Sequence, residues 1–147
     1  MTILFVLIAL AAGAVNPFQS GTNAQLNKQL SQPLWAGVWV YATGLLGMLL
    51  VQMFLRQPVP GAQAIASVKT WAWLGGLISI ASTMAGLMLA QKMGSGVFTG
   101  LTLTASLVTS VVLDQFGLVG FAQKSASPVR MIGCGVMIAG AWMIARG

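Results

Sequence analysis

The sequence predicts an all-α integral membrane protein with five transmembrane helices, and three observations lead to this fold class. Of the 147 residues, 57% are hydrophobic and only 5% are charged, whereas soluble domains average about 25% charged residues. Five apolar stretches are each long enough to cross a hydrocarbon core of about 30 Å, which takes roughly 17–25 helical residues. The charged residues fall between these stretches or near their ends. The lipid bilayer is therefore the expected surrounding of the chain.

The predicted helices follow one another along a single transmembrane domain of residues 1–147. They cover about residues 2–26, 33–55, 71–91, 96–113 and 129–145. Pro33 and Pro128 suit the first turns of the second and fifth helices, where a missing N–H leaves no hydrogen bond unmade. Residues 3–10 resemble the apolar part of a secretory signal, but no Lys or Arg precedes them and more spans follow. We therefore expect an uncleaved first helix.

The inventory of reactive side chains excludes most classes of enzyme. The chain has one acidic residue, Asp114, one cysteine, Cys134, and no histidine. A Ser or Cys nucleophile requires a general base, usually His, and glycoside hydrolysis uses two carboxylates. Metal sites need several oxygen, sulfur or imidazole ligands. We expect no catalytic residue, no metal and no cofactor, and we interpret Cys134 as a packing residue.

The basic residues are informative through their distribution. Seven Lys and Arg produce a net charge of +6, but they are scattered singly, so no nucleic-acid partner is expected. With five spans, the two sides of the membrane collect Arg56, Lys69, Lys124 and Arg130 against Lys28, Lys92 and Arg146. The positive-inside rule sets orientation by this count. A split of four against three fits either a weakly determined topology with the N-terminus inside or dual topology, in which the chain inserts both ways and pairs as an antiparallel homodimer.

Polar side chains follow one face of the first predicted helix. Asn16, Gln19 and Asn23 share this face, with Asn27 one turn further on, at about 100° per residue. Pro17 removes a backbone hydrogen bond, and freed backbone groups in a bilayer must be satisfied by neighbours or by a water-filled cavity. We interpret Asn16, Gln19 and Asn23 as substrate-binding. The alternatives are that the amides hold helices together, or that Asn23 and the residues after it lie at the membrane surface.

A second polar stripe follows the fourth predicted helix. Thr99, Thr102 and Ser106 lie with other hydroxyl residues within an arc of roughly 100°, whereas Thr104 points away. Hydroxyls of this kind line a path for a polar solute or permit close packing of helices. The sequence leaves both interpretations open, and we place all three residues among the candidates for substrate binding.

Aromatic and small residues complete the candidate surfaces. Trp39 and Tyr41 lie within the second helix, away from its start, where they either face a cavity and stack on a substrate or face core or lipid; Trp39 is placed among the substrate-binding candidates. Small residues indicate helix packing. They are spaced 4-3-4 on the third helix, from Gly75 through Ser79 and Ser82 to Gly86. Gly133 and Gly140, seven apart on the fifth helix, are the predicted packing or dimer contact.

Four segments are characteristic of a known family. They are NPFQSGTNAQL (16–26), WAWLGGLISI (71–80), AQKMGSGVFTGLTLTASLVTSVVLDQFGLVG (90–120) and SPVRMIGCGVMIAGAWMI (127–144). Through them the chain resembles the drug/metabolite transporter superfamily, in its short five-helix YdcZ-like branch. This resemblance implies a multi-pass exporter or transporter of the bacterial inner membrane, similar to half of a longer two-domain transporter, with known cases of dual topology. Related small multidrug resistance proteins use a membrane-embedded glutamate that this chain lacks, so their exchange of protons for cationic drugs is not carried over.

Together these features predict a transporter that moves a small polar or weakly charged solute by alternating access. Two copies would form an antiparallel homodimer of ten helices, with polar faces from both copies around a central cavity. The expected partners are a small-molecule substrate, the lipid bilayer and a second copy of the chain. Two alternatives stay open: a passive channel for a small solute or ion, and a membrane interaction protein without transport. Asp114 lies at a helix end, where pairing with Lys124 or Arg130 is expected rather than proton coupling.

Overall fold

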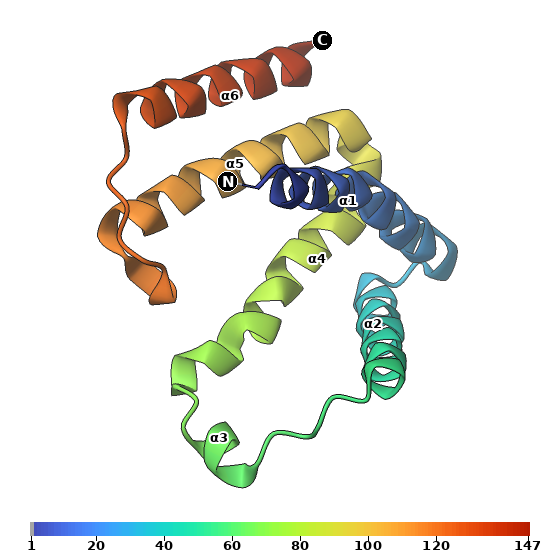
Figure 1. Ribbon diagram of the computed structural model, residues 1–147. Helices are drawn as coiled ribbons and strands as arrows, with labels where there is room; N and C mark the ends of the chain where they lie inside the picture. Colours follow the sequence, from blue (N-terminus) through green and yellow to red (C-terminus); the bar gives the residue numbers. More distant parts are fainter. Residues whose placement is uncertain (1) are drawn as a thin grey trace. The chain divides into compact units, whose positions relative to one another are not determined.

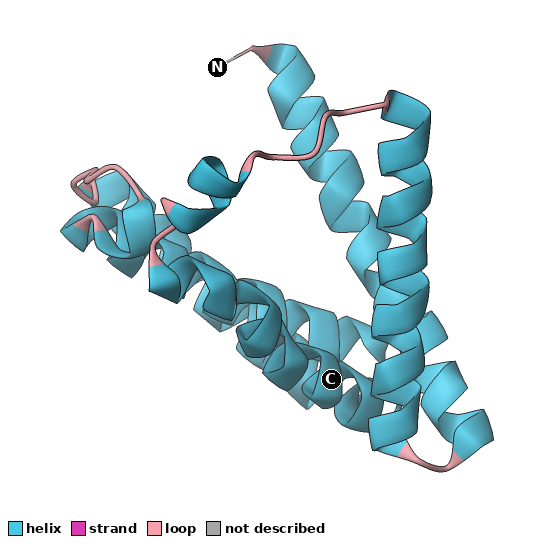
Figure 2. Cartoon of the chain, turned by 90° about the horizontal axis from the view of Figure 1, so that it is seen from below, coloured by secondary structure: helices cyan, strands magenta, loops and turns pink. Residues whose placement is uncertain are grey.

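The computed structural model describes residues 2–147, and within them it contains helices and loops but no strand (Figures 1 and 2). The elements are α1 (Ile3–Leu30), α2 (Pro33–Leu55), α3 (Ala62–Ala66), the 3₁₀ helix η1 (Thr70–Leu74), α4 (Gly75–Met93), α5 (Ser95–Phe116), the 3₁₀ helix η2 (Leu118–Gly120) and α6 (Pro128–Arg146). Among the described residues, five helical segments are long and apolar enough to cross a membrane: α1, α2, Thr70–Met93, α5 and α6. The predicted fold class is confirmed.

The exposed surface has the composition that a bilayer requires. Large apolar side chains are exposed along every long helix, for example Ile3 at 77%, Phe54 at 87% and Val129 at 77%. In water such a surface would drive aggregation, whereas in lipid it contacts acyl chains. The exposure of these side chains is therefore what a membrane-spanning chain needs.

Backbone geometry at specific residues ends α1 and α2. α1 runs to Leu30, beyond the predicted residue 26, and ends at Ser31, whose φ of 53° is left-handed. Gln32 then turns extended, because the residue before a proline is disfavoured in the helical region. α2 covers the predicted residues 33–55 and ends at Arg56, also left-handed with φ 51°. The polar side chains near the end of α1 therefore do not terminate the helix.

The chain divides into two compact units. One unit comprises Phe18–Lys92, and the other comprises the chain up to Pro17 together with Met93–Gly147. In the unit that contains Met93–Gly147, α5 and α6 run antiparallel beside one another (Figure 1). Thr104 is buried there and its hydroxyl donates to the carbonyl of Met137 at 3.4 Å. The threonine that points away from the predicted stripe is thus a packing residue.

The unit Phe18–Lys92 is held together around Leu87 of α4. Leu87 is 2% exposed, and Ala24 of α1 and Ala36 of α2 are 1% and 0% exposed. The side-chain amide of Asn27 donates to the Leu87 carbonyl at 2.8 Å. A Cβ on Gly37 of α2 would lie 3.7 Å from Cδ1 of Leu87. Small residues on α1 and α2 therefore let both helices approach α4 closely, as close packing in membranes requires.

Candidate functional site

A groove of about 530 Å³ opens in the unit Phe18–Lys92. It is lined by residues of α1, α2 and α4, namely Gln19, Val40, Tyr41, Gly44, Leu45, Met48, Ser79, Ser82 and Thr83. None of the nine is charged. The chemistry that this lining offers is neutral hydrogen bonding on one part of the wall and apolar contact on the rest.

Three hydroxyl groups form a connected cluster in this groove, called here the Tyr41 cluster. The phenol oxygen of Tyr41 is hydrogen bonded to Oγ of Ser79 at 2.8 Å and to Oγ1 of Thr83 at 2.9 Å. Ser79 and Thr83 are four residues apart on α4, so they project from the same face of that helix. Tyr41 is the one long side chain of the cluster, and it reaches them from α2. Its phenol therefore joins α2 to α4 by hydrogen bonds.

The hydroxyls next to the cluster are also bonded within α4. Oγ of Ser79 donates to the carbonyl of Gly76 at 2.7 Å, and Oγ of Ser82 donates to the carbonyl of Ser79 at 2.9 Å. Bonds of this kind let a hydroxyl sit in a membrane helix without an outside partner. In each of these bonds the single hydroxyl proton is donated to a backbone carbonyl, so the oxygen can only accept further hydrogen bonds.

The predicted substrate-binding residues are distributed over both units. Gln19 lines the groove. Asn23 is half-buried and Trp39 is 54% exposed, and neither borders the groove. Asn16 belongs to the other unit, where it is exposed. Of the predicted substrate-binding residues in the unit Phe18–Lys92, the groove is bordered by Gln19.

The predicted stripe on α5 lies in the unit that contains α6. Thr102 and Ser106 are exposed, and Thr99 is half-buried. The Thr102 hydroxyl bonds back to its own helix, at the carbonyl of Phe98, 2.9 Å away. These residues stay candidates for lining a path, since an exposed hydroxyl stripe is a surface that lipid does not favour.

Sequence reasoning missed most of the polar groove. It interpreted Ser79 and Ser82 as packing residues and did not single out Thr83. The signal that identifies them is a Ser/Thr set at positions 79, 82 and 83 of one helix face, combined with a tyrosine inside a neighbouring span. A phenol within a membrane span, away from water, needs a hydrogen-bond partner, and hydroxyls at this spacing supply one.

Asn27, from the same α1 stripe as Gln19, has a structural role. Its Nδ2 donates to the Leu87 carbonyl, and its Oδ1 is buried without a hydrogen-bond partner among the described residues. One turn away, Nε2 of Gln91 donates to Oε1 of Gln25 at 3.5 Å. This end of α1 is therefore joined to α4 through amides, while Gln19 faces the groove.

Asp114 lies at the C-terminal end of α5 and holds the connection to α6. Its Oδ2 accepts from Nη2 of Arg130 at 2.9 Å, with the two side chains 21% and 43% exposed. Its backbone carbonyl accepts from the N–H of Lys124 at 2.7 Å. The expected pairing with Arg130 is confirmed. A half-exposed ion pair is worth at most about 1 kcal/mol, so these contacts mainly define the geometry of the turn.

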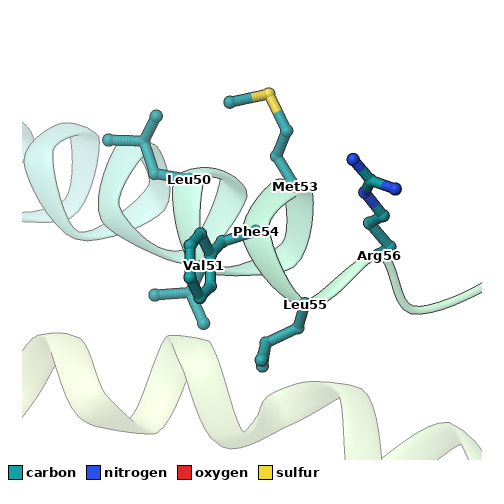
Figure 3. Close-up of a pocket in the computed structure, with 6 residues that line it drawn as sticks. All are labelled: Leu50, Val51, Met53, Phe54, Leu55 and Arg56. Carbon is teal, nitrogen blue, oxygen red and sulfur yellow. The ribbon is translucent and has the colours of Figure 1, made fainter.

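A second, apolar hollow of about 790 Å³ lies at the C-terminal end of α2 (Figure 3). Its residues are Leu50, Val51, Met53, Phe54, Leu55 and Arg56. All six come from one helix end, and in Figure 3 their side chains spread outward in different directions. With Arg56 as the only polar group, this hollow matches a lipid-facing surface near a membrane interface better than a solute site.

The chain matches one family model over residues 4–143, and that model, DMT_YdcZ, carries the description "Putative inner membrane exporter, YdcZ". The match covers nearly the whole chain. No curated protein and no solved structure matches the chain.

Proposed function

The chain belongs to the YdcZ-like branch of the drug/metabolite transporters, and from this premise we propose that it moves a small polar or weakly charged solute by alternating access, as an antiparallel homodimer. The family is one of inner membrane exporters rather than enzymes. The protein is accordingly a multi-pass protein of the inner membrane with a small-molecule substrate.

The observation that carries the proposal is the polar groove inside a membrane-spanning unit. Tyr41 follows the start of α2 at Pro33 by eight residues, or roughly 12 Å at 1.5 Å per residue. The Tyr41 cluster thus lies within the span, where polar groups are costly unless they face protein or a water-filled cavity. Hydroxyl groups at this depth can replace the hydrogen bonds that a polar solute loses when it leaves water.

The backbone at the two junctions between the compact units supports alternating access. The two compact units join at Pro17, inside α1, and at the Lys92–Met93 step beside Gly94. Pro17 lacks the N–H that would bond to the preceding turn, and Gly94 has a φ of 85° that other residues rarely adopt. Because a missing hydrogen bond and a glycine are common features of bends and hinges, we propose these two junctions as the hinges of alternating access.

Open faces on α5 and α6 support the homodimer. Apart from the neighbouring backbone of α6 itself, no atom of the described residues lies within 4 Å of a Cβ placed on Gly133 or Gly140. These glycines therefore leave room for a further helix to approach α6. The exposed hydroxyls of Thr102 and Ser106 on α5 are a second surface that a partner copy would cover. The near-even charge split allows that copy to be inverted.

Water access to the groove is the most direct test of transport. In a Cys134→Ser background, Gln19→Cys and Ser82→Cys should react with a small aqueous methanethiosulfonate reagent in membrane vesicles, because both line the groove. Leu46→Cys, exposed near the middle of α2 and outside the groove, is the matched control and should stay unreactive. Inertness at both groove positions would exclude a hydrated path and favour an interaction protein without transport.

Flux measurements in proteoliposomes separate a carrier from a pore. Saturable flux with exchange of internal for external solute is expected for alternating access. Single-channel currents that rise linearly with voltage would contradict it and indicate a passive channel.

A further inference from the structure

We infer that the Tyr41 cluster selects uncharged amphipathic solutes that donate a hydrogen bond, specifically a hydroxyl group carried on an apolar body. The inference rests on the proposed function, because it assigns a substrate class to the same groove. It follows from which hydroxyl group donates in each hydrogen bond of the cluster.

Each hydroxyl of the cluster has one proton, and the hydrogen bonds allow one consistent allocation. Ser79 donates to the carbonyl of Gly76, so its oxygen accepts the bond from Tyr41. Tyr41 has then used its proton, and the bond between Tyr41 and Thr83 must be donated by Thr83. The opposite direction would require Ser79 to give up the Gly76 carbonyl. All three protons are therefore used inside the protein.

The cluster consequently offers a solute only lone pairs. Oγ1 of Thr83 donates to Tyr41 and keeps its acceptor positions. Oγ of Ser82, next to the cluster, also keeps its acceptor positions, because its proton is donated to the carbonyl of Ser79. A solute O–H can bond to either oxygen. An ether or carbonyl at that position would place lone pair against lone pair and lose its bond to water without replacement.

The remaining wall of the groove defines the rest of the solute. Val40, Leu45 and Met48 are apolar, and Gly44 leaves the wall open beside them. None of the lining side chains is charged, so a charged solute would lose its hydration without a counter-charge. The exposed amide of Gln19, with both donors and an acceptor, can bind a second polar group. The fitting solute is therefore an uncharged alcohol with an apolar body.

Three probes with one apolar body test this selectivity. 2-Phenylethanol donates and accepts, its methyl ether only accepts, and the 2-phenylethylammonium cation donates but is charged. Binding of each to the full-length protein in nanodiscs is measured by equilibrium dialysis, with protein-free nanodiscs to subtract partition into lipid. We expect the alcohol to bind about threefold to tenfold more tightly than the ether, the value of one neutral hydrogen bond, and the cation to bind no more tightly than the alcohol.

Variants of the cluster should change the ratio of alcohol to ether affinity. Tyr41→Phe frees the Thr83 proton, which can then be donated to the ether, so the ratio should fall toward one. Ser82→Ala combined with Thr83→Val removes both open acceptors and should lower the ratio as well. Thr43→Val is the matched control, because Thr43 lies on α2 outside the groove and bonds to its own helix at the carbonyl of Trp39; it should keep the wild-type ratio. A ratio within one variant does not depend on how much of that protein is folded.

Each contrary result has a separate meaning. A wild-type ratio of one or less, a ratio unchanged in both cluster variants, tightest binding of the cation, or no binding of the alcohol would overturn the inference. If Gln19→Cys and Ser82→Cys still react with the aqueous reagent, the transport proposal survives that failure. If both cysteines are inert, the transport proposal itself has failed.

Discussion

The role of each polar residue depends on which groups of the folded protein its side chain contacts. Gln19 and Asn27 carry the same functional group on the same stripe of α1, yet Gln19 lines the groove and Asn27 binds a backbone carbonyl of α4. Thr102 and Thr104 differ in the same way, the first exposed and the second buried against α6. Asp114, the single acidic residue, is engaged by Arg130 at a helix end. Chemistry alone therefore does not assign these residues.

Asn27 offers a test of this balance at one residue. Asn27→Leu loses a hydrogen bond worth about 0.6–2 kcal/mol but also removes the buried Oδ1 that lacks a partner, so we expect a net loss of stability below about 1 kcal/mol. Asn27→Asp keeps the shape but sets an oxygen against the Leu87 carbonyl, and should cost about 2 kcal/mol or more. Thermal unfolding in detergent measures both. Gln29→Glu, the same chemical change at an exposed position of α1, is the control, and a loss in Gln29→Glu as large as in Asn27→Asp would contradict the role of this bond.

Whole helices are positioned by small residues where they meet. A Cβ on Gly37 of α2 would lie 2.6 Å from Cε of Met84 on α4, whereas one on Gly47 would meet nothing within 4 Å. The two glycines are ten residues apart on one helix, so they share its propensity but not its packing. The approach of α2 to α4 at Gly37 is also what brings Tyr41, one turn further along, within reach of Ser79 and Thr83.

The same substitution at the two glycines should therefore have different effects. Gly37→Val is expected to destabilise the protein by about 1 kcal/mol through overpacking, because the added side chain displaces the flexible end of Met84 and packs against Leu87. Gly47→Val should change stability by no more than about 0.5 kcal/mol, as surface substitutions usually do. Unfolding in detergent measures the difference. Equal effects at both positions would show that α2 does not depend on this contact.

The topology of the whole molecule depends on few charges. Four basic residues fall on one side of the five spans and three on the other, and the positive-inside rule acts through this difference. The antiparallel homodimer proposed above requires that both orientations occur. One or two added charges are then enough to decide between them.

C-terminal reporters for the two sides of the membrane should both be active on the wild-type chain. Gln57→Lys with Gln63→Lys, both in the α2–α3 region, raises the bias to six against three and should place the C-terminus outside only. Gln29→Lys with Gln32→Lys reverses the bias to four against five, which is the same size as the wild-type bias with the opposite sign, and should shift the distribution of the C-terminus toward the inside. A wild-type reporter active on one side alone would rule out dual insertion, and with it the antiparallel pair of identical chains.

The sequence was sufficient to predict the features that depend on residues close together in the chain. Hydropathy averaged over one window identifies each span, and Pro33 and Arg56 mark the two ends of α2, so five membrane helices and the residues 33–55 of α2 were predictable. The family resemblance was likewise carried by contiguous segments, and the family match confirms it. The charges near this helix end limited the expected partner of Asp114 to Lys124 or Arg130, and the structure shows Arg130.

The groove was decided by the tertiary structure. Whether Ser79 and Thr83 meet Tyr41, or instead only pack, depends on how far α2 and α4 rotate about their axes and where they cross. Lipid is as apolar as the helix surfaces, so no hydrophobic difference selects that rotation. It is selected by close contacts such as Gly37 against Met84 and Asn27 against Leu87, which join residues 47 and 60 positions apart. The sequence by itself determined that the chain lies in the membrane and which side chains are available there; the packing of its helices determined which of them form a site.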